Sequence, residues 1–246
     1  MTTICAIGSK SLSHVLSIIE RCKSRLTSLG QSSPAARTQI IASVVNYWRD
    51  VQIGSALNIV DKLLNYTIVT PSSVVAWALD AQRLDGGKQL AESWVYEMIE
   101  RTMNKVTNRV AQIVAARMAH DLPAEQISML DAALEEEVSR MRALFAEVDD
   151  ALAGVSEGAS EGMLEDADTG VDGVGEEVEL ARGWGVRWRR VWTRKLEVQE
   201  TVLREAGKVF PGPAAEVVEE VAGEMVVDVD GGVGGVVETD GGDEVL

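Results

Sequence analysis

Apolar residues recur every three or four positions along most of the first 210 residues, which is the spacing of one face of an α-helix. Two of these segments open with a hydroxyl residue and a proline, Ser33-Pro34 and Thr70-Pro71. Such a pair is typical of a helix start, because the hydroxyl oxygen accepts a hydrogen bond from a free backbone amide and proline fits the first turn. The pattern predicts helices at 11–29, 34–50, 55–64 and 71–79, with Gly30 ending the first.

Two longer helical patterns follow a break at residues 84–87. The first runs from Gln89 to Met118, which corresponds to about 45 Å at about 1.5 Å per residue. A corner at Asp121 to Pro123 leads into the second, which ends at Leu152. We interpret the two as an antiparallel helical hairpin. A coiled-coil seam is the alternative, because spacings that alternate between three and four are also those of heptads.

A last apolar pattern covers residues 181–210 and is amphipathic. The residues predicted for its inner face are Trp184, Trp188, Val191, Trp192, Leu196, Val198, Val202 and Leu203. Four arginines fall outside this face: Arg187, Arg189, Arg190 and Arg194. Because no convincing strand pattern occurs in the first 210 residues, the sequence predicts an all-α, HEAT-like helical-repeat solenoid with a long helical hairpin.

The net charge of −16 is spread unevenly along the chain. Residues 1–150 are nearly neutral and residues 181–210 carry 8 basic and 3 acidic side chains, whereas residues 151–180 and 211–246 carry 9 and 10 acidic side chains and no basic one. The two acidic segments lack aromatic residues and a sustained helical stripe, so we expect them to be disordered. The predicted organisation is a helical-repeat domain at 8–152, an acidic disordered linker at 153–180, an Arg/Trp helix at 181–210 that packs on the domain, and an acidic tail at 211–246.

Residues that carry catalysis or hold metals are scarce. His14 and His120 are the only histidines, and neither has neighbours at metal-ligand spacing. Cys5 and Cys22 are the only cysteines, and we interpret them as inert thiols. We therefore expect no enzymatic activity and no cofactor. We also expect no membrane partner, because no apolar run approaches the roughly 20 residues of a membrane helix and no basic-then-apolar leader opens the chain.

The arginines of the last helix are the remaining candidates for a binding site. Guanidinium groups beside aromatic rings grip phosphates and stack on bases in many nucleic-acid sites. The tryptophans here share the face that is predicted to be buried, which favours a core helix with a solvated basic side. The alternative is a contact of Arg187, Arg189, Arg190 and Arg194 with an RNA backbone or with an acidic protein surface.

A family resemblance lies in the joint order of several strings. GSKSLSHVLSIIERCKSRL, IIASVVNYWRDVQIGSALNIVDKLLNYTIVTPSSVVAWAL and ESWVYEMIERTMNKVTNRV resemble the carboxy-terminal part of the large subunits of the nuclear cap-binding complex, particularly the fungal ones. GWGVRWRRVWTRKLEV resembles the helix on which that family resumes after a variable charged segment. The resemblance covers residues 8–118 and 181–203. It implies a helical-repeat domain similar to the middle domain of initiation factor 4G.

The same resemblance implies a function. The large subunit of that family is a scaffold beside a small partner with an RNA-recognition fold, and the partner holds the methylguanosine cap, so no cap-binding residue carries over to this chain. We therefore expect a non-enzymatic nuclear scaffold that reaches capped RNA through its partner and supports mRNA processing, export and metabolism. A helical-repeat or coiled-coil adaptor without an RNA role is the alternative.

Overall fold

The residues described by the computed structural model, 1–119, 122–165 and 174–209, form helices joined by turns. The chain divides into two units, Met1–Arg204 and Glu205–Leu246, and the second is described only where it completes the last helix. The elements follow in the order α1 (Thr2–Gly8), α2 (Leu12–Arg21), α3 (Lys23–Ser32), α4 (Pro34–Asn65), α5 (Pro71–Ala78), α6 (Ala81–Leu84), the 3₁₀ helix η1 (Asp85–Ala91), α7 (Ser93–Arg117), α8 (Ala124–Glu165) and α9 (Val174–Val209). The predicted all-α class is confirmed.

The first predicted helix is two helices in the structure. α2 ends at Arg21 and α3 begins at Lys23, because the backbone of Cys22 leaves the helical region with φ −100° and ψ 7°. α3 then continues through Gly30 to Ser32. The predictions of one helix at 11–29 and of an end at Gly30 are therefore wrong. No glycine or proline marks the break, and the apolar spacing continues across it.

The two predicted hydroxyl-proline helix starts are confirmed. The Ser33 hydroxyl accepts a hydrogen bond from the Ala36 amide at 3.1 Å. The Thr70 hydroxyl accepts one from the Ser73 amide at 3.2 Å, and the Ser73 hydroxyl accepts one from the Thr70 amide at 3.0 Å. The second arrangement is a reciprocal capping box. These contacts fix the first residues of α4 and α5.

The predicted helices at 34–50 and 55–64 form a single kinked element, α4. Its backbone leaves helical geometry at Gln52, where φ is −160° and ψ is 85°. The Ser55 hydroxyl donates a hydrogen bond to the Gln52 side-chain oxygen at 3.0 Å as the helix resumes. Trp48 before the kink and Leu63 after it are both buried, so both halves of α4 contribute to the core.

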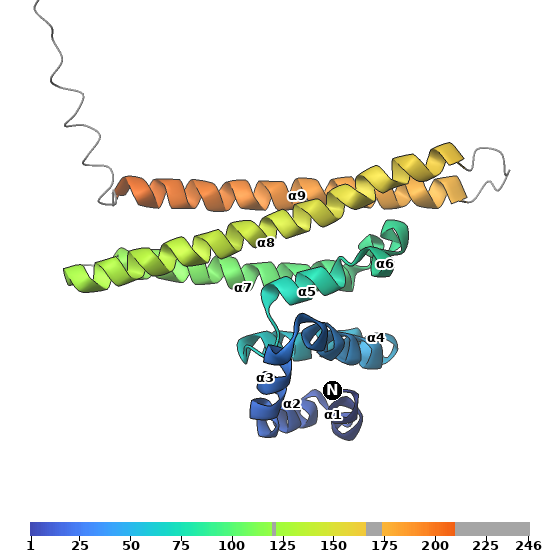
Figure 1. Ribbon diagram of the computed structural model, residues 1–246, viewed down its shortest axis with the longest axis horizontal. Helices are drawn as coiled ribbons and strands as arrows, with labels where there is room; N and C mark the ends of the chain where they lie inside the picture. The colour runs from blue at the N-terminus through green and yellow to red at the C-terminus, as the bar shows by residue number, and fades with distance from the viewer. Residues whose placement is uncertain (120–121, 166–173, 210–246) are drawn as a thin grey trace, which may run out of the picture. The chain divides into compact units, whose positions relative to one another are not determined.

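The long helices α7 and α8 form the predicted antiparallel hairpin and lie side by side in Figure 1. α8 buries Met141, Val148 and Leu152, which lie at spacings of seven and four residues. The Arg117 Nε of α7 donates a hydrogen bond to the Asp131 carboxylate of α8 at 2.7 Å. The hairpin is therefore held by an apolar seam with a charged pair beside it.

The structure differs from the sequence-based boundaries beyond Leu152. α8 continues to Glu165 and α9 begins at Val174, so these parts of the predicted disordered linker at 153–180 are helical instead. Residues 166–173 and the predicted tail at 211–246 lie outside the described residues. The chain beyond Leu152 has a packing partner that its composition does not reveal, namely the glycine turn of η1.

Gly87 provides that packing partner. Its φ is +100°, and a β-carbon added there would lie 2.6 Å from Cγ1 of Val155 on α8 and 3.0 Å from Cβ of Ala181 on α9. Positive φ and such a close approach are both tolerated by glycine and strained for other residues. Gly87 therefore allows η1 to pack directly against both helices.

α9 packs on α7 and α8 through aromatic residues. Trp188 and Trp192 are 4% and 2% exposed, and their ring centroids lie 5.2 and 5.8 Å from that of Tyr96 on α7. Three valines predicted for the inner face are exposed instead: Val191, Val198 and Val202, at 38%, 52% and 48%. The buried face of α9 is thus narrower than the apolar face in the sequence.

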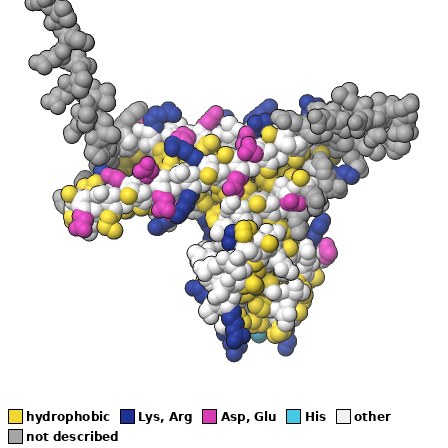
Figure 2. Space-filling model, in the orientation of Figure 1, with side chains coloured by type: hydrophobic (Ala, Val, Ile, Leu, Met, Phe, Trp, Pro, Cys, Tyr) yellow, Lys and Arg dark blue, Asp and Glu magenta, His cyan; other side chains and the backbone are white. Residues whose placement is uncertain are grey.

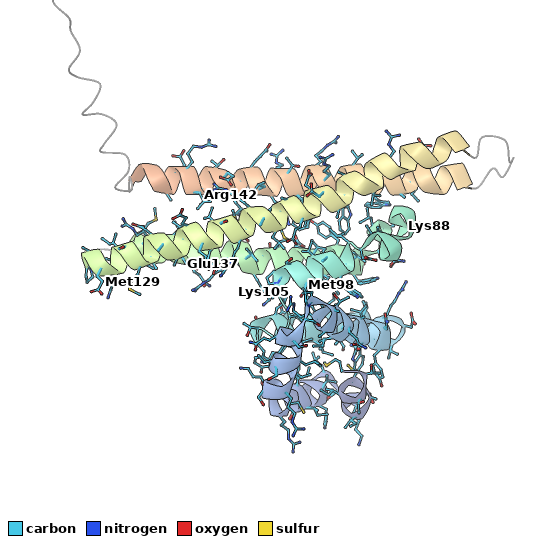
Figure 3. All side chains as sticks on the ribbon, in the orientation of Figure 1. Lys88, Met98, Lys105, Met129, Glu137 and Arg142 are labelled. Atoms are coloured by element: carbon cyan, nitrogen blue, oxygen red, sulfur yellow. The ribbon has the colours of Figure 1, made fainter. Side chains whose placement is uncertain are left out.

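Polar contacts join α7 to α4. The Lys105 ammonium lies 2.9 Å from the Asp61 carboxylate and donates a hydrogen bond to the Asn65 side chain at 2.6 Å. Arg101 donates a hydrogen bond to the Asn58 side chain at 2.9 Å. Figure 3 shows Lys105 on the side of α7 from which these contacts are made. The long helices and the N-terminal helices are therefore linked by charge as well as by apolar packing.

Candidate functional site

The four arginines singled out in the sequence occupy two places. Arg189, Arg190 and Arg194 line one groove between α8 and α9, with a volume of about 890 Å³. Arg187 lies outside this groove, with its guanidinium carbon 5.3 Å from the centroid of the Trp184 ring. We call the cavity the α8–α9 groove. Figure 2 shows Lys and Arg side chains interspersed with Asp and Glu side chains over the long helices.

Two bidentate ion pairs bridge α8 and α9 at this groove. Arg189 donates hydrogen bonds to both carboxylate oxygens of Asp149, at 2.7 and 2.8 Å. Arg142 does the same to Glu200, also at 2.7 and 2.8 Å. These hydrogen bonds hold the pKa of the Asp149 and Glu200 carboxyl groups below their usual values. Two parallel bonds per pair fix the orientation of one helix against the other.

We expect the Arg189–Asp149 pair to stabilise the fold above about pH 4 and to lose that effect in acid. The folded-state pKa of Asp149 is depressed, so the stabilisation is complete above the unfolded pKa and is lost as the pH falls through the folded one. Urea unfolding at pH 7 and pH 3 should show wild type more stable than Asp149→Asn at pH 7, with a smaller difference at pH 3. The effect is modest, because the Asp149 side chain is 41% exposed.

The neighbouring carboxyl group provides the control for this experiment. Asp150 is exposed and forms no ion pair with the residues that the structure describes. Asp150→Asn should therefore leave the pH dependence of unfolding as it is in wild type. A wild-type advantage over Asp149→Asn that is equally large at both pH values would contradict the assignment of the ion pair.

Trp188 and Trp192 of α9 belong to the core, and Trp192 also lines the floor of the groove. The centroid of the Trp192 ring lies 6.4 Å from that of Phe145 on α8. The Lys195 ammonium lies 4.6 Å from the Trp192 centroid and donates a hydrogen bond to the Glu100 carboxylate of α7 at 2.6 Å. The ring of Trp192 is thus surrounded by protein, which agrees with the interpretation of a core helix with a basic outer side.

Arg142 is the groove residue that the sequence reasoning missed. It lies on α8, 58 positions before its partner Glu200 (Figure 3). Arg142 lies seven positions before Asp149 on the same helix, so both residues share one face of α8. This spacing is the feature of the sequence that could have identified Arg142. Which face of α8 meets α9 is set by tertiary packing.

The other candidates for chemistry have structural environments. Burial raises the pKa of the Cys5 thiol, which is 0% exposed. The Nδ1 atom of His14 lies 2.7 Å from the hydroxyl of Ser11, the residue that caps α2. His120 lies outside the described residues. Within the described part of the chain, no three His, Cys, Asp or Glu side chains are grouped to hold a metal ion.

None of the described helices combines the length and apolar character that crossing a bilayer needs.

Comparison with known proteins identifies the family. Residues 1–201 match the family described as MIF4G like. The nuclear cap-binding protein subunit 1 of Schizosaccharomyces pombe is 24% identical over 154 residues, which are 60% of this chain and 18% of that protein. The proteins of the same name from Arabidopsis thaliana and Caenorhabditis briggsae are 24% identical over 112 and 110 residues, in each case 45% of this chain and 13% of theirs.

The chain therefore spans less than a fifth of the length of the curated relatives it matches. The family match covers all the helices from α1 to α8 and most of α9, including the residues of the α8–α9 groove. With its helical-repeat fold, the chain belongs to the MIF4G-like family.

Proposed function

We propose that this chain is a non-enzymatic scaffold of a nuclear cap-binding complex and that it reaches capped RNA through a small partner with an RNA-recognition fold. One observation carries the proposal: the MIF4G-like match over residues 1–201 coincides with relatives that share the name nuclear cap-binding protein subunit 1. The proposed location is the nucleus, and the proposed processes are the processing, export and metabolism of mRNA.

The structure of the described residues supports a scaffold in two ways. Charged side chains join its helices, as in the Arg142–Glu200, Arg189–Asp149 and Lys105–Asp61 pairs. Its largest side chains, such as Trp192, are buried among aromatic neighbours. A rigid helical frame of this kind presents extended surfaces to other proteins.

Co-purification with the small cap-binding subunit of the same organism tests this proposal. The tagged full chain should retain the small subunit, with and without a cap analogue, and should not retain an unrelated RNA-recognition domain of similar size. Failure to retain the small subunit under both conditions would favour the helical adaptor without an RNA role.

A further inference from the structure

Two arginines on the α9 side of the α8–α9 groove are available for an incoming anion. Arg190 and Arg194 are exposed, and neither forms an ion pair with any residue in the described ranges. They lie four positions apart, so their backbones are about 6 Å apart along the helix axis and both face the same side. The groove thus offers two guanidinium groups at a fixed spacing.

The other two arginines of the groove already have anionic partners. Arg142 is held by Glu200 and Arg189 by Asp149, each through two hydrogen bonds. These pairs fix the walls of the groove and neutralise its inner charges. The positive charge open to a ligand therefore comes from Arg190 and Arg194.

The floor between the walls is apolar. Phe145 and Trp192 lie beneath the groove, and Val186 and Leu196 line it as well. Val186 is 42% exposed, so an aliphatic side chain placed there would remove apolar surface from water. The Trp192 ring is already in contact with Tyr96, Phe145 and Lys195, which leaves it unsuited to stacking on a nucleobase.

The covered Trp192 ring favours a peptide over RNA. Bases of single-stranded RNA gain affinity by stacking on exposed aromatic rings, and Trp192 already lies against Tyr96 and Phe145. A peptide that binds through its carboxylates needs no such ring. In an extended peptide, alternate side chains point to the same face and are about 6.6 Å apart, close to the spacing of Arg190 and Arg194.

We propose that the α8–α9 groove is a docking site for an acidic peptide in which Asp or Glu alternates with aliphatic residues. The carboxylates on one face of the extended peptide bind Arg190 and Arg194 of α9, and the aliphatic side chains on its opposite face lie against Phe145 and Ala146 of α8. This site adds a binding surface to the proposed scaffold. A test of this site is independent of the cap-binding role, because peptide binding does not require the small partner.

Fluorescence anisotropy with the full chain tests this docking site. The probe is a labelled ten-residue peptide that alternates Asp and Val, and the comparison ligands are a Lys/Val peptide and a ten-nucleotide oligouridylate. The chain has a net charge of −16 and repels acidic ligands in general, so binding of the Asp/Val peptide reports a specific site. The double variant Arg190→Gln/Arg194→Gln should bind it about tenfold or more weakly.

The matched control is Arg187→Gln, which removes an exposed arginine of the same helix outside the groove. Its affinity for the Asp/Val peptide should stay within about twofold of wild type, and far-ultraviolet circular dichroism should be the same for all variants. Three results would overturn the proposal: no binding of the Asp/Val peptide, equal binding by the double variant, or tighter binding of oligouridylate that the double variant loses.

Discussion

Replacing Trp192 with alanine is expected to lower the free energy of unfolding by about 3–5 kcal/mol. Trp192 is 2% exposed, and it lies among Tyr96 of α7, Phe145 of α8 and Lys195 of its own helix. Removal of the indole leaves a cavity where the three long helices meet, and the surrounding rings cannot fill it without moving the backbones. Urea unfolding followed by circular dichroism at 222 nm measures the loss.

Trp184→Ala is the matched control for Trp192→Ala. Trp184 lies two turns earlier on α9, is only half-buried, and has the Arg187 side chain over its ring. We expect a loss of about 1 kcal/mol, because less apolar surface returns to water. Equal losses for the two variants would mean that α9 does not pack on α7 and α8 through the Trp192 face.

Replacing Gly30 with alanine is expected to cost about 2–3 kcal/mol or more, which is a large effect for a single added methyl group. A β-carbon at Gly30 would lie 2.0 Å from the carbonyl oxygen of Ile68, far inside van der Waals contact. The obstacle is backbone rather than a flexible side chain, so α3 or the turn after α4 has to move. The Gly30 carbonyl also accepts a hydrogen bond from Arg37 at 2.9 Å, and such a movement would strain it.

Gly183→Ala makes the same chemical change at a helical position that has nothing within 4 Å of the added carbon. We expect this variant to be about 0.5–1 kcal/mol more stable than wild type, because alanine loses less backbone entropy in a helix. The two substitutions should therefore have opposite signs in the same urea experiment. A neutral result at Gly30 would show that α3 does not approach Ile68 as closely as described.

Local signals explain which parts of the fold could be predicted from the sequence. Ser33-Pro34 and Thr70-Pro71 mark helix starts correctly, because a cap depends on residues within one turn of each other. The break at Cys22 has no such signal, since neither glycine nor proline occurs there and the apolar spacing is uninterrupted. The helical segments at 153–165 and 174–180 were not predicted, and the approach of Gly87 to Val155 and Ala181 is a long-range contact that local sequence does not show.

In the groove, too, local features could be predicted from the sequence, whereas contacts between distant residues could not. The arginines of α9 were identifiable as an outer, basic side, but their partners were not. Arg142 and Glu200 are 58 positions apart and Asp149 and Arg189 are 40 apart, so their pairing follows from how α8 and α9 pack. The sequence pattern also places Val191 and Val198 on the buried face of α9, whereas both are exposed. Periodicity alone does not show how much of the apolar face the neighbouring helices cover.

Retention on a methylguanosine-cap resin is the most direct test of the proposed scaffold function. The small cap-binding subunit is bound to the resin first, and the full chain is then added with or without it. The chain should be retained only when the small subunit is present, and free cap analogue should release both proteins together. Retention of the chain in the absence of the small subunit, or its loss in the flow-through while the small subunit stays bound, would contradict the account.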